Sequence, residues 1–243
     1  MAKRLPNLSL IMIDNLDSSP TGNTITHHLG ILGGTFDPIH YGHIKPALDA
    51  ADLLALDKVL VMPAHIPPHK QSTHANAQQR LTMTKLACEP YPQLVPDSRE
   101  LERSKVSYTV DTLSEIKQQH PSTTLYFMMG MDSLLSFTQW HRWQEILTLC
   151  HLVVATRPNY RLDLAKNGLD ASLAKRVKTH AEVKHTAKQT QQKQQGSIIL
   201  ITNQSVDISS TEIRLAIKSG EDISAFLPSD VHQYIQQQNL YQN

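Results

Sequence analysis

Five short apolar runs, each followed by a stretch with helical spacing, constrain the fold of this chain more than any other feature. The runs are unbroken rather than alternating, as expected of strands buried on both faces of a parallel sheet. They are Leu29–Leu32, Val59–Met62, Leu125–Met128, Leu152–Ala155 and Ile198–Ile201. Apolar residues recur three and four positions apart in Ile44–Leu56, Ala77–Cys88, Val110–Gln119 and Thr211–Ser219. The pattern predicts an α/β fold, a Rossmann-like doubly wound parallel sheet with helices on both faces.

The length of 243 residues suits one α/β domain with a sizeable core. Residues 14–26 are rich in Ser, Asn, Thr, Gly and Pro, so we expect residues 1–26 to form a flexible arm. A single domain then spans residues 27–243. Within it, residues 159–195 are dense in Lys, His, Gln, Ala and Thr, and we expect a solvent-exposed helical insertion that ends in a flexible loop.

Composition excludes several classes of function. The 23 Lys and Arg residues balance 22 Asp and Glu residues, so no overall positive field would attract nucleic acid or an anionic membrane. Cys88 and Cys150 lack metal-ligand spacing, which favours buried thiols in a reducing compartment over a disulfide framework or a zinc site. The apolar run within Met1–Ile13 is too short for a signal peptide or a membrane span. We expect a cytoplasmic protein with local anion sites, and the sequence leaves its oligomeric state open.

The segment Gly33–His43 lies between the first strand and the first long helix, where open α/β sheets bind their ligands. Gly33 and Gly34 remove side chains at a point where the backbone must approach a phosphate or a ribose. His40 and His43 are three residues apart, which places both rings on one face of the first helical turn, beside the positive end of the helix dipole. The alternative is a plain loop with ordinary histidines, but the combined pattern favours an anion site.

A second candidate motif, Ile208–Arg214, follows the last predicted strand and opens a helix. Ser209 or Ser210 with a nearby acidic residue also describes a simple N-cap. Capping alone does not call for Arg214, whose guanidinium lies one turn along the helix and can pair with phosphate oxygens. The motif therefore favours a phosphate contact.

A third candidate is Gly130 with Asp132, directly after the strand Leu125–Met128. Gly130 allows a ligand to come close, and Asp132 can accept hydrogen bonds from ribose hydroxyls. The alternative for Asp132 is a helix cap, which by itself would explain an aspartate at this position.

With these three motifs in order, the chain from about Leu29 onwards resembles the nucleotidyltransferase superfamily that carries a His-x-Gly-His motif, here His40–His43. Within it, the chain is similar to the bacterial nicotinate-nucleotide adenylyltransferases. The resemblance implies that ATP and nicotinate mononucleotide are the substrates, that His40, His43 and Arg214 are catalytic, and that Mg²⁺ accompanies ATP. The implied ATP-binding residues are Gly33, Gly34, Thr35, Phe36, Gly130, Asp132, Ile208, Ser209, Ser210 and Thr211.

The choice of acceptor depends on two further segments. Trp140 stands in a polar context, where an indole often stacks on a flat ring, although a Trp that packs two helices together is the alternative. In the resembled family the matching Trp stacks on the pyridine ring, and backbone N–H groups near the residues matching Thr109 and His141 hold the ring carboxylate. Lys70 and Arg157 are implied to contact substrate phosphate, and exposed surface cations are the alternative for both.

The acceptor phosphate has a second pKa near 6 and is already anionic at neutral pH, so no catalytic base is required. We therefore expect His40 and His43 to donate hydrogen bonds to the α- and β-phosphates while charge builds there. No protein-only metal cage is expected, because Mg²⁺ would be held by substrate oxygens and water. The competing hypotheses are a phosphopantetheine adenylyltransferase, which lacks counterparts of Trp140 and of the segment 107–112, and a nucleotide-binding regulator without turnover.

Overall fold

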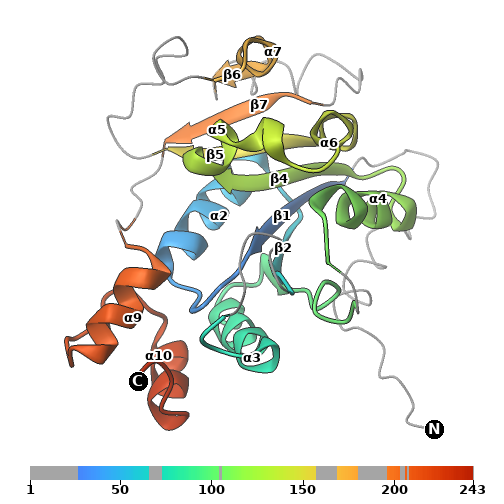
Figure 1. Cartoon of the computed structure of the whole chain (residues 1–243). Coiled ribbons are helices and arrows are strands. Elements are labelled where there is room, and N and C mark those ends of the chain that lie inside the picture. Colours follow the sequence, from blue (N-terminus) through green and yellow to red (C-terminus); the bar gives the residue numbers. More distant parts are fainter. Residues whose placement is uncertain are drawn as a thin grey trace, which may run out of the picture.

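A computed structural model describes residues 27–65, 73–103, 106–156, 169–179, 196–202, 206 and 208–242. Its centre is a seven-stranded sheet with the order β3-β2-β1-β4-β5-β7-β6, in which every pairing is parallel (Figure 1). The strands are β1 (His28–Gly34), β2 (Lys58–Pro63), β3 (Leu94–Pro96), β4 (Thr124–Gly130), β5 (Cys150–Thr156), β6 (Val177–Thr179) and β7 (Ile198–Thr202). The predicted α/β fold with a parallel sheet is confirmed.

The order of the strands places a topological switch point between β1 and β4. The chain leaves β1 towards β2 and β3 at one edge, and then returns to β4 on the other side of β1. Leu29 is paired with Lys58 of β2 on one side and with Leu125 of β4 on the other. Ligands of open α/β sheets bind at such a point, outside the carboxyl ends of the strands.

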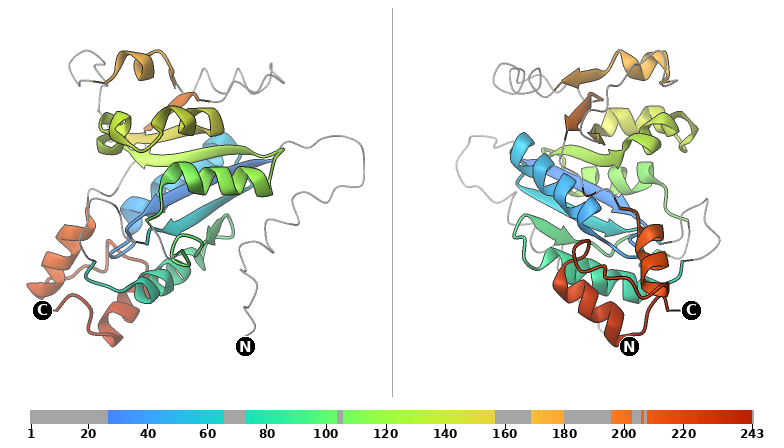
Figure 2. Two further views of the ribbon diagram at one scale, coloured as in Figure 1. Left: turned by 45° about the vertical axis from the view of Figure 1, so that its right-hand side comes forward. Right: turned by 90° about the vertical axis from the view of Figure 1, so that its left-hand side faces the viewer.

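Helices cover both faces of the sheet (Figure 2). Each face has its own apolar core. One core receives side chains of α2 (Tyr41–Leu54), α3 (Ala77–Cys88), α9 (Ser210–Lys218) and α10 (Ser229–Gln237). The other receives side chains of α4 (Thr109–Gln119), α5 (Met131–Leu135), η1 (Phe137–Gln139), α6 (Trp143–Leu149) and α7 (Ala171–Ala174). This two-sided cover explains why the strand runs are apolar at every position.

Side-chain caps begin the helices that surround the switch point. Asn76 caps α3 and accepts from the backbone N–H of Gln79, while the Gln79 side chain accepts from the N–H of Asn76, each at 2.9 Å. Ser209 and Glu212 form the same reciprocal capping box at the start of α9. These caps satisfy N–H groups that a helix cannot pair internally.

The structure corrects several details of the predicted elements. The short strands β3 and β6 carry only three residues each and were missed. Segment 159–195 was expected to be an exposed helical insertion; its described part, residues 169–179, contains the short helix α7 and also the strand β6, which pairs with β7, and the side chain of Leu173 is buried. The arm at residues 1–26 and the remainder of that segment, 159–168 and 180–195, lie outside the described residues.

Cys88 and Cys150 are buried free thiols, as predicted. Burial raises the pKa of each thiol to about 12, so neither is a reactive thiolate at neutral pH. Across the described residues, the helices are too short or too polar to cross a bilayer.

Candidate active site

At the carboxyl end of β1, two glycines leave the backbone at the switch point without side chains. Gly33 and Gly34 are the last two residues of β1 rather than part of the turn that follows it. A Cβ on Gly34 would lie 2.5 Å from the Phe36 ring, so a side chain at this position would displace Phe36. Phe36 has a φ of 49° and its side chain is buried in the core. The predicted contact of Phe36 with ATP would therefore involve its backbone and not its ring.

His40 and His43 form a capping box at the start of α2, which fixes the tautomer of both rings. Nδ1 of His40 accepts from the N–H of Gly42 at 3.1 Å, and Nδ1 of His43 accepts from the N–H of His40 at 3.3 Å. Because each Nδ1 is an acceptor, each neutral ring carries its hydrogen on Nε2. The ring centroids are 3.8 Å apart, so the two Nε2–H donors start from neighbouring positions.

Burial keeps both imidazoles neutral at physiological pH. It lowers the pKa of His40 to about 4, although the nearby charge of Glu212 acts in the opposite direction. The pKa of His43 is lowered well below its usual value, by burial and then by the proximity of His40. Two neutral N–H donors can bind phosphate oxygens without giving up a proton.

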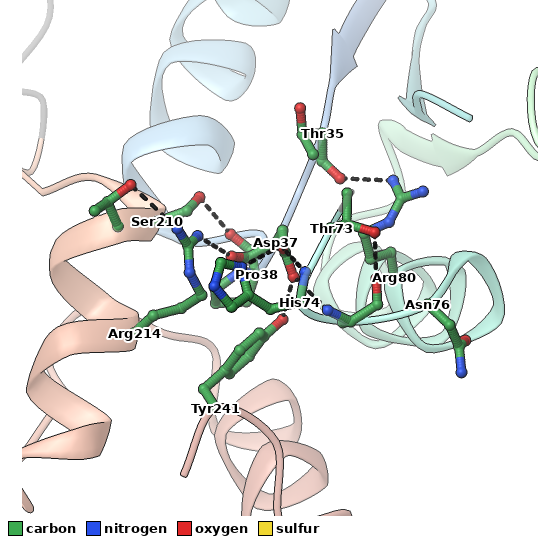
Figure 3. Close-up of polar contacts among 12 residues, drawn as sticks. Thr35, Asp37, Pro38, Thr73, His74, Asn76, Arg80, Ser210, Arg214 and Tyr241 are labelled. Carbon is green, nitrogen blue, oxygen red and sulfur yellow. Dashed lines mark hydrogen bonds and ion pairs between the residues drawn. The ribbon is translucent and has the colours of Figure 1, made fainter. Parts of the chain in front are cut away.

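The predicted C-terminal motif meets this turn from the other side (Figure 3). The hydroxyl of Ser210 donates to the carbonyl of Pro38 at 2.9 Å, and Nη1 of Arg214 donates to the carbonyl of Asp37 at 2.7 Å. Nη2 of Arg214 donates to Thr211 Oγ1 at 3.3 Å. The structure thus brings the His40–His43 and Ile208–Arg214 motifs together at the start of two helices.

Asp132, which follows β4, does not cap α5. The N-cap of α5 is Gly130, with no hydrogen bond from a side chain to the cap, and Asp132 is exposed in the first turn. A Cβ on Gly130 would meet no atom within 4 Å. The surface beside Gly130 is therefore open for a ligand.

Two adjoining pockets occupy the switch point. The larger has a volume of about 930 Å³ and is lined by Thr35, Thr109 and His141, while the smaller has about 450 Å³ and is lined by His40, His43, Gly130 and the start of α9. The residues that line both are Gly33, Gly34, Phe127, Asp132, Ser133 and Trp140. The two cavities therefore share one wall, formed by the end of β1, by β4, by the start of α5 and by Trp140.

The larger pocket has the features expected for a flat, negatively charged ring. Trp140 is half-buried, with its ring edge-to-face against Phe127 at a centroid distance of 6.0 Å. The N-cap of α4, Tyr108, makes no capping hydrogen bond through its side chain. The first N–H groups of α4, from Thr109, are thus available to an anion. His141 stacks on Tyr108 with the centroids 4.3 Å apart.

Most sequence-predicted residues gather around these pockets, with a few exceptions. Ile208, Ser209 and Ser210 line the smaller pocket, whereas Thr211 and Arg214 lie beyond its lining. Thr35 lines the larger pocket rather than the one that contains the histidines. Lys70 and Arg157 fall outside the described residues, so their predicted contacts stay predictions.

Several polar residues near the site received no individual role in the sequence analysis. Glu100 lines the larger pocket and accepts a hydrogen bond from Thr112 Oγ1 at 2.7 Å, and burial raises the pKa of this carboxyl. Ser107 lines the same pocket, and its buried hydroxyl has no hydrogen-bond partner among the described residues. Asp37, in the turn that follows β1, and Arg80 on α3 are both buried. Asp37 and Ser107 lie within segments that the sequence singled out, whereas no periodic pattern marks the charged side chains of Glu100 and Arg80 as buried.

The fold and the paired pockets define a class of protein: an α/β protein with a two-part ligand site at the switch point of its parallel sheet. A cytidylyltransferase-like family model matches residues 31–216. The chain is 44% identical over 214 residues to a probable nicotinate-nucleotide adenylyltransferase of Aeromonas salmonicida, covering 88% of this chain and 97% of that protein. A protein of the same name from Psychromonas ingrahamii is 42% identical over 213 residues, covering 88% and 96%.

The chain therefore belongs to the cytidylyltransferase-like family, in the group that contains the nicotinate-nucleotide adenylyltransferases. A solved structure supports the fold independently. The nicotinic acid mononucleotide adenylyltransferase of Plasmodium falciparum, in complex with NaAD, matches with a TM-score of 0.64 at 21% identity. The match covers 88% of this chain and 97% of that one.

Proposed function

We propose that the protein transfers the adenylyl group of ATP to nicotinate mononucleotide, forming nicotinate adenine dinucleotide and pyrophosphate as a step of NAD biosynthesis. The observation that carries this proposal is the wall shared by the two pockets. Transfer between two nucleotides requires both to be bound with their phosphates in contact, and a common wall of glycines and Asp132 allows this approach. The names of its relatives agree with this activity.

ATP occupies the smaller pocket in this proposal, and the mononucleotide occupies the larger one. His40 and His43 donate from Nε2 to phosphate oxygens of ATP, and the free N–H groups at the start of α9 contact the same phosphates. Arg214 lies one turn further along α9, where its guanidinium can exchange the Asp37 carbonyl for a phosphate oxygen. Gly130 and Asp132 serve the adenosine at the end of β4.

The acceptor ring lies against Trp140, and its carboxylate is held by backbone N–H groups at the start of α4, near Thr109, and near His141. A ring carboxylate is an anion and a carboxamide is not, so the uncapped start of α4 favours nicotinate over nicotinamide. Lys70 and Arg157, which lie outside the described residues, remain proposed contacts of the acceptor phosphate.

In the reaction, a phosphate oxygen of the acceptor forms a bond to the α-phosphorus of ATP. The bond from that phosphorus to the oxygen that bridges to the β-phosphate breaks, and its electron pair leaves with pyrophosphate. The acceptor oxygen is already anionic, so the protein moves no proton. Its contribution is to position the two phosphates in line and to stabilise charge on the leaving oxygen through the His40 and His43 N–H groups.

Mg²⁺ is proposed to enter with ATP. In the described part of the chain, no group of three or more metal-ligating side chains is found, and Asp132 is the carboxylate that lines both pockets. One carboxylate beside a phosphate site suits Mg²⁺, which keeps water and substrate oxygens as ligands. When bound, the ion would neutralise phosphate charge. The buried free thiols also support the proposed cytoplasmic location.

Pyrophosphate release with a panel of acceptors tests the function. We expect release with Mg-ATP and nicotinate mononucleotide, weaker release with nicotinamide mononucleotide, and none with phosphopantetheine. Equal or faster turnover with phosphopantetheine would overturn the assignment. A protein that binds ATP but releases no pyrophosphate with any acceptor would instead support a regulator without turnover.

A further inference from the structure

A buried arginine on α3 contacts the turn of residues 35–37, which follows β1. Arg80, on α3, is 1% exposed. Its Nη1 donates to the carbonyls of Thr35 and Ala64, both at 2.7 Å, and its Nη2 donates to the carbonyl of His65 at 2.8 Å (Figure 3 shows the Thr35 contact). Among the described residues, no carboxylate forms an ion pair with it. Burial of a cation is costly, and the three carbonyl contacts, together with the nearby charge of Asp37, offset that cost.

These contacts fix the direction of the backbone N–H groups in the turn. In a trans peptide the carbonyl and the N–H point in opposite directions. The carbonyl of Thr35 shares a peptide with the N–H of Phe36, so the contact with Arg80 points that N–H away from α3. The carbonyl of Ala64 shares a peptide with the N–H of His65, which is directed in the same way. The φ of 49° at Phe36 is unfavourable for an aromatic residue and needs such a fixed neighbour.

The next residue of the turn is held by the end of the chain. Asp37 is buried, and its Oδ1 accepts from the hydroxyl of Tyr241 at 2.8 Å and from the N–H of Ala75 at 3.0 Å, while its Oδ2 accepts from the N–H of His74 at 2.8 Å (Figure 3). Burial alone would raise the pKa of Asp37, but these hydrogen bonds outweigh burial and keep it below its usual value. The backbone carbonyl of Asp37 is the acceptor for Arg214.

We propose that Arg80 and Tyr241 are positioning residues of the adenylyl-transfer site, which hold the peptides of residues 35–37 so that the turn and Arg214 face the phosphates. The proposal rests on the proposed function for its kinetic readout. Neither side chain lines either pocket. Their effect on the reaction is therefore indirect, through the backbone of the turn.

Two other buried side chains provide matched controls, because their hydrogen bonds do not reach residues 35–37. Arg99 is 6% exposed and pairs with Asp97 at 2.8 Å. Tyr126 is 8% exposed, and its hydroxyl lies 3.1 Å from Nδ1 of His28 at the opposite end of the strands. Arg99→Lys and Tyr126→Phe therefore disturb a buried guanidinium and a buried hydroxyl without touching the turn.

The test compares Arg80→Lys and Tyr241→Phe with these controls. A lysine keeps the charge of Arg80 but cannot reproduce its planar fork to three carbonyls, and Tyr241→Phe removes one hydroxyl without changing packing. We expect kcat to fall about tenfold or more in Arg80→Lys and about threefold or more in Tyr241→Phe, with KM for ATP changed much less. The controls should lower the melting temperature by similar amounts and leave kcat within about twofold of wild type.

Amide hydrogen exchange of the segment 33–38 without substrate supplies a readout that needs no turnover. Exchange should be faster in Arg80→Lys and Tyr241→Phe than in wild type, and unchanged in the controls. A wild-type protein that shows no activity with nicotinate mononucleotide would refute the proposed function, and the exchange data would still decide whether the turn is held from behind. Wild-type exchange, or wild-type kcat in an active enzyme, in both variants would overturn the positioning role.

Discussion

Replacement of His43 by alanine separates the two roles that the structure gives to this ring. Its Nδ1 accepts a long hydrogen bond of 3.3 Å from the N–H of His40, and its ring packs edge-to-face against Phe36 at 5.1 Å. Loss of the capping contact costs about 1 kcal/mol, and loss of the ring contact adds about 0.5–1.5 kcal/mol. For a domain with an unfolding free energy of about 5–15 kcal/mol, this leaves more than 90% of the molecules folded at 25 °C even at the lower end.

The loss of a donor to the transition state is a larger effect. Removal of one preorganised N–H that binds developing negative charge lowers kcat by about 10²–10³, or about 2.7–4 kcal/mol. A melting curve and steady-state kinetics on the same sample of His43→Ala should therefore show a decrease of a few degrees and a decrease in kcat of about a hundredfold or more. KM for ATP should change much less.

Gln79→Ala is the matched control, since Gln79 occupies in the α3 capping box the position that His43 occupies in α2. It should lower the melting temperature by a similar amount and leave kcat unchanged. Near-normal turnover in a well-folded His43→Ala protein would refute the assignment of the central donor. A stability loss large enough to account for the loss of activity would show that the histidine is structural.

Further predictions concern the ring pocket, the open strand end and the acid sensitivity of the site. Trp140→Ala should raise KM for nicotinate mononucleotide by tenfold or more, about 1–3 kcal/mol of stacking, and should raise KM for ATP much less, because Trp140 borders the smaller pocket but stacks only on the acceptor ring; an equal effect on both substrates would contradict stacking. Gly130→Ala should raise KM for ATP without lowering the melting temperature, because its Cβ would face open space; unchanged KM would mean that no ligand approaches there. The pKa of His40 is about 4 in the folded protein and about 6.5 when unfolded, so the unfolded state takes up the extra proton. Stability should then fall as the pH falls from about 6.5 to 4, by up to about 3 kcal/mol, and this fall should be smaller in His40→Asn, which retains a capping residue; denaturant unfolding at pH 7.5 and 4.5 measures the difference.

Local patterns in the sequence were sufficient to predict the central strands and the main helices. The helix predicted at Ala77–Cys88 from its apolar spacing matches α3 to the residue, and the structure adds a capping box of Asn76 and Gln79 at its start. The edge strand β6 could not be found in this way. Its three residues, Val177–Thr179, depend on pairing with β7 rather than on a pattern of their own.

The site was predictable where its residues form a motif in the chain, as at His40 and His43. It was not predictable where residues far apart in the sequence meet through the fold. Tyr241 lies 204 positions from Asp37 and contacts its carboxylate, and Arg80 reaches back 45 positions to Thr35. The capping explanation for Asp132 was also wrong. The backbone geometry makes Gly130 the N-cap of α5, and the sequence does not show where the helix begins.

The fate of the α-phosphate of ATP tests the central claim most directly. Incubation of the protein with nicotinate mononucleotide and ATP labelled at the α-phosphorus should place the label in the dinucleotide, whereas label at the γ-phosphorus should appear in pyrophosphate. This result would follow from attack of the acceptor phosphate on the α-phosphorus across the wall that the two pockets share. Label from the α-position in free AMP or inorganic phosphate, with no labelled dinucleotide, would contradict the account.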